Sequence, residues 1–341
     1  MDDFYKRTDI DKSTVELTIT IPKDSFNKSY KAMLDQELSN TKIDGFRKGK
    51  VPSNLVETEL GTSIKVKVFE QLLPMYLTTA LQKENLSPIA PPNYKNFPDL
   101  TKDQDLVISV DITIMPEFKL GNLKKIQIIQ EDTKVTDKEV EEAISNLFKN
   151  DNLGEKEIND KWAVKVSEKL KVDAIKSVKD FNEFVKKTIE NQKKIVSRRK
   201  AEDDALNQAI NICKIEIPQA AIQYEAEERE HSFVHDFGHD QSKIDTFLKS
   251  NNVSMEKMKE LWLKDAKEAL ETDVFLKLFA REKEINVTDE ELKTKIKEIV
   301  NKSPNIEDKS LFENEEWKEY VRRVEEKEKA FRAFSKEVLG E

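Results

Sequence analysis

The sequence predicts an α+β N-terminal domain followed by an elongated, mostly all-α C-terminal domain with helical arms. Three observations favour this fold class. The chain has only seven Gly among 341 residues, roughly 2% against about 7% in an average protein. Charged and apolar residues each make up 37%, which is little apolar material for one large core. Eight of the ten Pro lie in the first 116 residues. Scarce glycine also argues against dinucleotide folds, phosphate-binding loops and turn-rich β-sandwiches.

The N-terminal domain is expected over residues 1–115. Apolar residues alternate with polar ones over 15–21, which predicts a half-buried strand, and a second strand is expected over 106–114. An apolar stripe at helical spacing predicts a helix over 24–39. A polar loop is expected over 40–52 and a second helix after it, with a kink or break at Pro74.

Residues 116–158 are expected to form a linker strand and helix, and 159–341 a helical domain. Thr136–Glu139 and Thr288–Glu291 each match the capping box that opens a helix. The longest predicted helix runs from about 178 to 213.

The apolar runs, the N-terminal residues, the cysteine count and the net charge indicate where the protein acts and with which partners. No apolar run approaches the ~20 residues that span a bilayer, and the N-terminus is too polar for a signal peptide. We therefore expect a cytoplasmic protein with no membrane partner. Cys213, the single cysteine, is expected to be a small buried hydrophobe rather than a reactive thiol. The net charge of −9 argues against general coating of nucleic acid but leaves room for a local basic patch.

The most distinctive segment is a basic loop with an aromatic residue. It reads Gly45-Phe46-Arg47-Lys48-Gly49-Lys50-Val51-Pro52. An exposed Phe beside cations supplies an apolar anchor and charges that steer it to an anionic surface. The alternative is a solvated loop whose Phe packs back onto its own domain.

Together with Ile43 and Asp44, this loop resembles the ribosome-binding loop of bacterial trigger factor. The resemblance continues in the Glu59-Leu60-Gly61 turn, the Pro-rich segment 88–92 and the strand ending at 115–117. Segments 215–218 and 284–292 resemble the C-terminal domain of the family. The similarity covers most of the chain.

The resemblance implies an ATP-independent chaperone that docks on the large ribosomal subunit near the polypeptide exit, on protein and rRNA. The implied ribosome contacts are Phe46, Arg47 and Lys48, with Gly45, Gly49, Lys50 and Pro52 shaping or charging the loop. Its helical part would hold nascent or unfolded polypeptides. The candidate client-binding residues are Phe233, Phe237, Phe247, Phe312 and Phe331. Dimerisation in the family also allows a homodimer off the ribosome.

The family usually carries a prolyl isomerase domain of the FK506-binding type after the linker helix. Here only about seven residues, 151–157, separate that helix from sequence resembling the C-terminal domain. No room remains for a domain of about 100 residues, so the isomerase domain is expected to be absent at about 150–158. We expect no enzymatic activity and find no catalytic residues.

Two further clusters receive structural interpretations. His231, His235 and His239 are spaced for one helix face, but Gly238 interrupts that helix, so we expect no metal site and no cofactor. A basic run over 186–200 is expected to be a solvated face paired with the acidic residues at 202–204; RNA contact is the alternative.

Two other functions stay open. One is a ribosome-anchoring module without client-holding activity, and the other is a SurA-like periplasmic folding factor. The missing signal peptide argues against the second.

Overall fold

The computed structural model describes residues 4–40, 51–129, 132–150, 154–172, 175–302, 312 and 314–340. The chain forms two compact units. One contains residues 1–118 and 216–271, and the other contains 119–215 and 272–341. The bounds of the three domains expected from the sequence remain a prediction. No helix in the described part of the chain is long and apolar enough to cross a membrane.

The N-terminal part is a four-stranded antiparallel sheet packed against two helices, which confirms the predicted α+β region. The strands β1 (Tyr5–Asp9), β2 (Thr14–Ile21), β3 (Asn93–Lys95) and β4 (Leu106–Thr113) lie in the order β1-β2-β4-β3. Alternate residues of β2 and β4 are buried against α1 (Lys23–Asn40) and α2 (Ser53–Lys83). The alternation read from the sequence therefore marks the face of the sheet that the helices cover.

The two helices approach closely at Gly61, which is buried inside α2. A Cβ at this position would lie 3.2 Å from the Tyr30 hydroxyl of α1, so a small residue suits the contact. The prediction of a turn at Glu59-Leu60-Gly61 is wrong, because this glycine serves helix packing. Of the kink or break expected at Pro74, the break is absent, since α2 runs through this residue without interruption; the kink stays a prediction. The surrounding apolar core holds the helix together although Pro74 has no N–H to donate.

In the second unit, three helices share a small core. They are α3 (Asp137–Asn150), α4 (Asp160–Leu170) and α5 (Val178–Cys213). Trp162 of α4 is completely buried, with its ring 5.3 Å from that of Phe181 and 5.5 Å from that of Phe148. The long helix predicted over 178–213 is confirmed in full.

The capping box before α3 forms as predicted: the Thr136 N–H donates to Glu139 Oε2 at 2.9 Å, and the Glu139 N–H donates to Thr136 Oγ1 at 3.3 Å. The box of Thr288 and Glu291 repeats this arrangement before α9 (Asp289–Lys302).

The remainder of this unit joins the end of α8 (Met255–Glu282) to α10 (Glu315–Leu339). Phe275 and Phe279 of α8 pack edge-on against Phe334 of α10, with ring centroids 4.9 and 5.7 Å apart. The end of α8 and the end of α10 therefore share an aromatic core.

The segment before α3 packs on the end of α5. A short 3₁₀ turn, η1 (Leu123–Lys125), follows Gly121, whose N–H donates to Cys213 Sγ at 3.4 Å. Cys213 is buried, and burial raises the pKa of its thiol. The expectation of a buried cysteine is thereby confirmed.

Candidate binding surface

The basic loop lies largely outside the described residues. Gly45, Phe46, Arg47, Lys48, Gly49 and Lys50 are not among them. The described flank begins with Val51, which is buried, and Pro52, which directly precedes α2. The carbonyl of Pro52 accepts from the N–H of Leu55 and Val56. The loop sequence thus joins the end of α1 to the first turn of α2.

Polar contacts fix the two helices to each other on the same side of the sheet. Lys67 of α2 pairs with Glu37 of α1 at 3.0 Å. The Tyr30 hydroxyl donates to Glu57 at 3.1 Å, and Lys102 pairs with the same carboxylate. Hydrogen bonds from Lys102 and then Tyr30 lower the pKa of Glu57. The charged network leaves Glu57 ionised at neutral pH.

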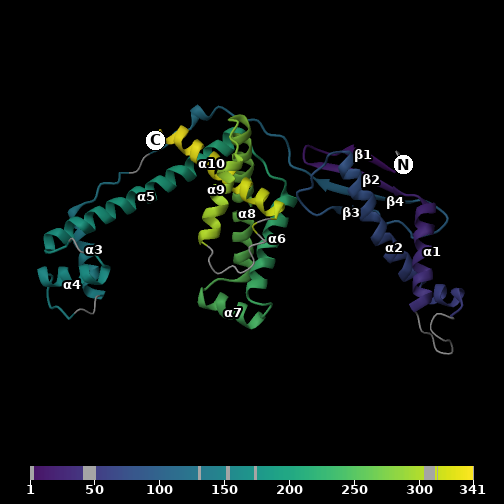
Figure 1. The fold of residues 1–341 in the computed structure, drawn as a ribbon, viewed down its shortest axis with the longest axis horizontal. Coiled ribbons are helices and arrows are strands. Elements are labelled where there is room, and N and C mark those ends of the chain that lie inside the picture. Colours follow the sequence, from purple (N-terminus) through teal and green to yellow (C-terminus); the bar gives the residue numbers. More distant parts are fainter. Residues whose placement is uncertain are drawn as a thin grey trace. The chain divides into compact units, whose positions relative to one another are not determined.

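Residues 216–271 form a thin helical arrangement that carries the clearest exposed apolar surface. It contains α6 (Gln219–Asp236), α7 (Gln241–Ser250) and the first part of α8. Ile222 and Ala226 of α6 are buried against Ala266 of α8. Figure 1 shows α6 and α8 side by side with α7 across one end. The shared core is small, so many side chains of the three helices stay in contact with solvent.

Four aromatic side chains gather where these helices meet, and we call them the aromatic cluster: Phe233, Phe237, Phe247 and Trp262. Phe233 lies at the centre. Its ring centroid is 5.0 Å from that of Phe237, 5.7 Å from that of Phe247 and 5.3 Å from that of Trp262. Phe237 and Phe247 are 5.3 Å apart. Such tilted and edge-on pairs each contribute about 0.5–1.5 kcal/mol beyond area burial.

The aromatic cluster is only partly covered. Phe247 is 38% exposed and the other three rings are half-buried. Leu261, next to Trp262 in the sequence, is 40% exposed. The rings hold one another in place while presenting apolar edges to solvent. An arrangement of this kind can receive apolar side chains of another chain without a fixed register.

The structure brings together only part of the predicted client-binding set. Phe233, Phe237 and Phe247 meet in the aromatic cluster. Phe312 and Phe331 belong to the other unit. There the Phe312 ring contacts Trp317 at 5.1 Å, and Phe331 is half-buried on α10. The sequence analysis missed Trp262, because only its packing against Phe233 of α6 shows that it belongs to this surface.

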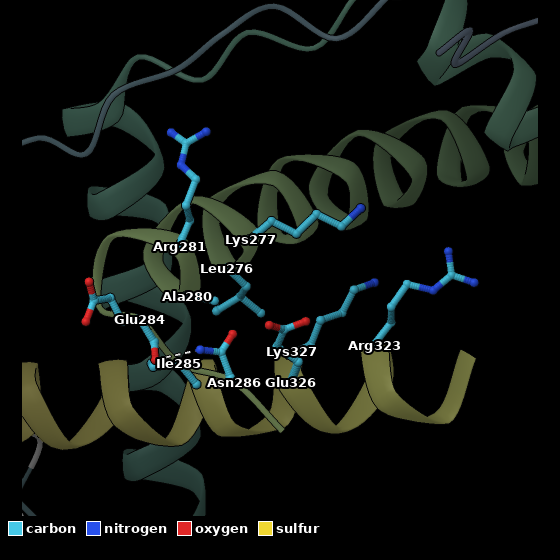
Figure 2. Close-up of a pocket in the computed structure, with 10 residues that line it drawn as sticks. All are labelled: Leu276, Lys277, Ala280, Arg281, Glu284, Ile285, Asn286, Arg323, Glu326 and Lys327. Atoms are coloured by element: carbon cyan, nitrogen blue, oxygen red, sulfur yellow. Dashed lines mark hydrogen bonds between the residues drawn. The ribbon is translucent and has the colours of Figure 1, made fainter. Parts of the chain in front are cut away.

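A cleft of about 590 Å³ lies between the end of α8 and α10 (Figure 2). Its apolar lining consists of Leu276, Ala280 and Ile285. Its charged lining consists of Lys277, Arg281, Arg323, Lys327, Glu284 and Glu326. Figure 2 shows Leu276 between the two helices and the long basic side chains extending outward at the rim. The cleft thus combines an apolar floor with a charged rim.

One carboxylate organises the basic rim. Asp273 pairs with Lys277 at 2.8 Å and also with Lys327. Burial works to raise the pKa of Asp273, but the hydrogen bonds from the two lysines outweigh it and lower the pKa. Asp273 thus stays ionised, and two cations share one negative charge. Sequence analysis missed this cleft because nothing in the sequence says that α10 returns to the end of α8.

Several cations of the basic run on α5 are paired, mostly with partners other than those predicted. Lys186 and Lys193 reach α3, bonding Asp137 at 3.2 Å and Glu139 at 2.7 Å. Arg198 pairs with Glu202 at 3.1 Å as expected. These pairs favour the interpretation of a solvated, ion-paired face.

The three histidines lie close together on the exposed surface of α6 and the turn after it. The His239 ring centroid is 5.8 Å from that of His235 and 6.4 Å from that of His231. As the side chains stand, no group of three or more His, Cys, Asp or Glu within the described ranges is arranged to hold a metal ion.

Comparisons with known proteins agree on one family. The family model described as bacterial trigger factor protein matches residues 5–147, and the model described as the trigger factor C-terminus matches residues 177–335. Trigger factor of Staphylococcus epidermidis is 29% identical over 169 residues, which is 49% of this chain and 38% of the relative. Trigger factor of Tolumonas auensis is 32% identical over 133 residues, which is 39% of this chain and 30% of the relative. These matches span well under half the length of either relative.

A solved structure described as "Promiscuous Substrate Recognition in Folding and Assembly Activities of the Trigger Factor Chaperone" has the same fold. Its TM-score is 0.58 at 18% identity, covering 98% of this chain and 99% of that chain. The sheet with two helices and the long helical units define a protein of the class that combines a small α+β domain with helical arms. Because the two family models together cover most of the sequence, the chain belongs to the bacterial trigger factor family.

Proposed function

We propose that this protein is an ATP-independent, ribosome-associated molecular chaperone that holds nascent or unfolded polypeptides on exposed apolar helical surfaces. The observation that carries the proposal is the aromatic cluster of Phe233, Phe237, Phe247 and Trp262, a partly exposed apolar surface in a member of the trigger factor family. Its clients are polypeptides with exposed apolar side chains. Binding relies on many weak contacts, so a client leaves and folds without nucleotide hydrolysis.

Two features favour holding over tight binding. The rings of the aromatic cluster already contact one another, so a client gains only the area of these rings that is still exposed. The cleft between α8 and α10 adds a second apolar surface, with charges at its rim that accept polar parts of a chain. Apolar surface that a client removes from water contributes about 25 cal/mol per Å². Because the exposed apolar area of the cluster is small, the affinity for a client is modest and the client exchanges rapidly.

Aggregation of a heat-unfolded enzyme, followed by light scattering without ATP, tests the holding activity. We expect the wild-type protein to suppress scattering and the double variant Phe237→Ser/Phe247→Ser to need several-fold higher concentrations for the same effect. Val196→Ser is the matched control, since Val196 is 51% exposed on α5, outside the aromatic cluster. Equal protection by the double variant would contradict the role of the cluster. No protection by the wild type would favour the anchoring module.

Ribosome docking is the second part of the proposal and rests on the sequence of the loop, with Phe46, Arg47 and Lys48 as the central contacts. Its flanking helices are braced by the Lys67–Glu37 pair and by the close contact at Gly61. Ionic steering predicts that binding weakens as salt rises. Co-sedimentation with ribosomes should be lost in Phe46→Ala/Arg47→Ala/Lys48→Ala. A variant that sediments as well as the wild type would contradict this docking mode.

We also infer that the chain has no prolyl isomerase domain between its two matched regions. Only residues 148–176, 29 in number, separate those regions. α4 occupies 160–170 of that interval and buries Trp162 in the core shared with α3 and α5. A separate domain needs at least about 50 residues, so this interval is too short to hold one.

A further inference from the structure

The end of α6 places all three histidines of the chain next to one another. His231 and His235 are one helical turn apart, so they share a face of α6. The helix ends at Asp236, and the next residues turn back sharply: Gly238 and His239 both have left-handed backbone conformations, with φ of 63° and 59°. The Gly238 N–H donates to the His235 carbonyl at 2.8 Å, and the His239 N–H donates to the Val234 carbonyl at 3.0 Å.

This turn reverses the argument against a metal site. No metal site was expected from the sequence, because Gly238 interrupts the helix before the third histidine. Instead the interruption folds His239 back, so that its ring lies 5.8 Å from that of His235 and 6.4 Å from that of His231. Two imidazoles bound to one tetrahedral zinc ion, with Zn–N distances of about 2.1 Å, have ring centroids about 5 Å apart. The observed spacings are about 1 Å larger.

We propose that His231, His235 and His239 form a three-imidazole site for a divalent transition-metal ion, with Zn²⁺ as the ion that suits it. The rings do not converge in the structure as it stands. All three side chains are exposed, so each can rotate about its two side-chain bonds and direct a nitrogen to a common point. Three protein nitrogens leave the fourth position of a tetrahedral ion to water.

The surroundings favour a cation. Residues 216–271 contain 13 acidic and seven basic residues, a net charge of −6 within a chain of −9. Asp236 and Asp240 directly follow two of the histidines, and Asp240 caps α7 by accepting from the Ser242 N–H at 3.0 Å. Imidazole nitrogens prefer Zn²⁺, Ni²⁺ and Cu²⁺ over Mg²⁺ and Ca²⁺. The negative charge therefore favours a cation, and the imidazole ligands favour Zn²⁺, Ni²⁺ or Cu²⁺ among the cations.

The site is distinct from the aromatic cluster. His231 and His235 precede Phe233 and Phe237 by two positions, which is about 200° around a helix. A bound ion thus lies on the opposite side of α6 from the aromatic rings. It would tie the turn at His239 to the last turns of α6 and so stiffen the connection to α7, which carries Phe247.

Titration of the full chain with ZnCl₂ after EDTA treatment, followed calorimetrically, tests the proposal. The wild type should bind one equivalent with a dissociation constant below about 10 µM. His231→Ala, His235→Ala and His239→Ala should each weaken binding at least tenfold. Ser232→Ala, an exposed neighbour on α6, is the matched control and should bind like the wild type. Helical circular dichroism without metal should be equal in all five proteins.

Two results would overturn the proposal. Wild-type binding weaker than about 10 µM means that isolated imidazoles or carboxylates bind the ion singly. Unchanged binding by His239→Ala means that the turn supplies no ligand. Substitution with Co²⁺ gives an independent readout, because a tetrahedral site of bound imidazoles gives the intense visible absorption that an octahedral aqua ion lacks. That absorption should disappear in each single histidine variant.

Discussion

Gly121 is the position where adding a single carbon atom should disturb this structure most clearly. A Cβ at Gly121 would lie 2.5 Å from Ile212 Cγ2 and 2.8 Å from the Ile212 carbonyl oxygen. Ordinary contacts between carbon atoms begin at about 3.5 Å. The isoleucine side chain can rotate, but its carbonyl is fixed in the last turn of α5. In Gly121→Ala, the segment that carries residue 121 must therefore move outward by about 1 Å.

Two limits bracket the size of the effect. Overpacking of this kind costs about 1–3 kcal/mol. Releasing the segment from α5 altogether would expose Leu123, at about 1.5–3 kcal/mol. It would also break the paired bonds between Gln127 and Gln208, at about 1 kcal/mol each. Release is therefore costlier than strain, so the segment stays bound in a strained form. We expect the free energy of unfolding of this unit to fall by about 1–3 kcal/mol.

The single cysteine supplies the assay. Cys213 is only 6% exposed and its Sγ accepts the Gly121 N–H, so a thiol reagent reacts when the segment opens. A loss of about 1–3 kcal/mol in the opening free energy raises the reaction rate about 5- to 150-fold, since 1.4 kcal/mol is tenfold. Lys119→Ala, an exposed change in the same segment, should leave the rate unchanged. A Gly121→Ala protein with the wild-type rate and wild-type stability would refute the close approach at α5.

Three further predictions concern stability and activity. Trp162→Ala should lower the free energy of unfolding by about 3–5 kcal/mol in urea titrations followed by circular dichroism, because Trp162 is fully buried; a loss below about 1 kcal/mol would contradict the core of α3, α4 and α5. Hydrogen bonds, first from Lys193 and Lys329 and then within the capping boxes, lower the pKa of Glu139 and Glu291 from 4.5 to about 2. The two carboxylates therefore stabilise the folded state above pH 4.5, and this stabilisation is lost as the pH falls toward 2. Over this pH range the Tm of Glu139→Gln/Glu291→Gln should fall less than the Tm of the wild type. A proline-peptide assay should give only the uncatalysed isomerisation rate, and measured catalysis would contradict the inferred absence of the isomerase domain.

Local signals in the sequence predicted the elements of the fold well. Alternation over 15–21 and 106–114 marked the two central strands, and both capping boxes marked the starts of helices. The predictions failed where tertiary packing decides. Gly61 marks a close contact between α2 and Tyr30 of α1 rather than a turn. Pro74 does not end α2 because the sheet and α1 hold the helix in place. Neither contact can be read from the neighbouring residues.

The candidate binding surface was predicted only in part, for a similar reason. Phe233 and Phe237 are one helical turn apart, so their proximity follows from the sequence. Phe247 and Trp262 join them because α7 and α8 fold back onto α6, which depends on long-range packing. The sequence predicted correctly that Gly238 interrupts the helix before His239. It did not show that the left-handed turn brings His239 next to the other histidines.

Photo-crosslinking at the aromatic cluster tests the central claim most directly. A benzophenone amino acid replaces Phe247, which is 38% exposed, and the protein is irradiated with an unfolded, aggregation-prone enzyme without ATP. The same probe at Thr188, an exposed position of α5, is the control. The account predicts strong crosslinking from position 247 to the unfolded enzyme, little from position 188, and loss of both with the folded enzyme. Equal crosslinking from the two positions, or none from position 247, would contradict client holding at the aromatic cluster.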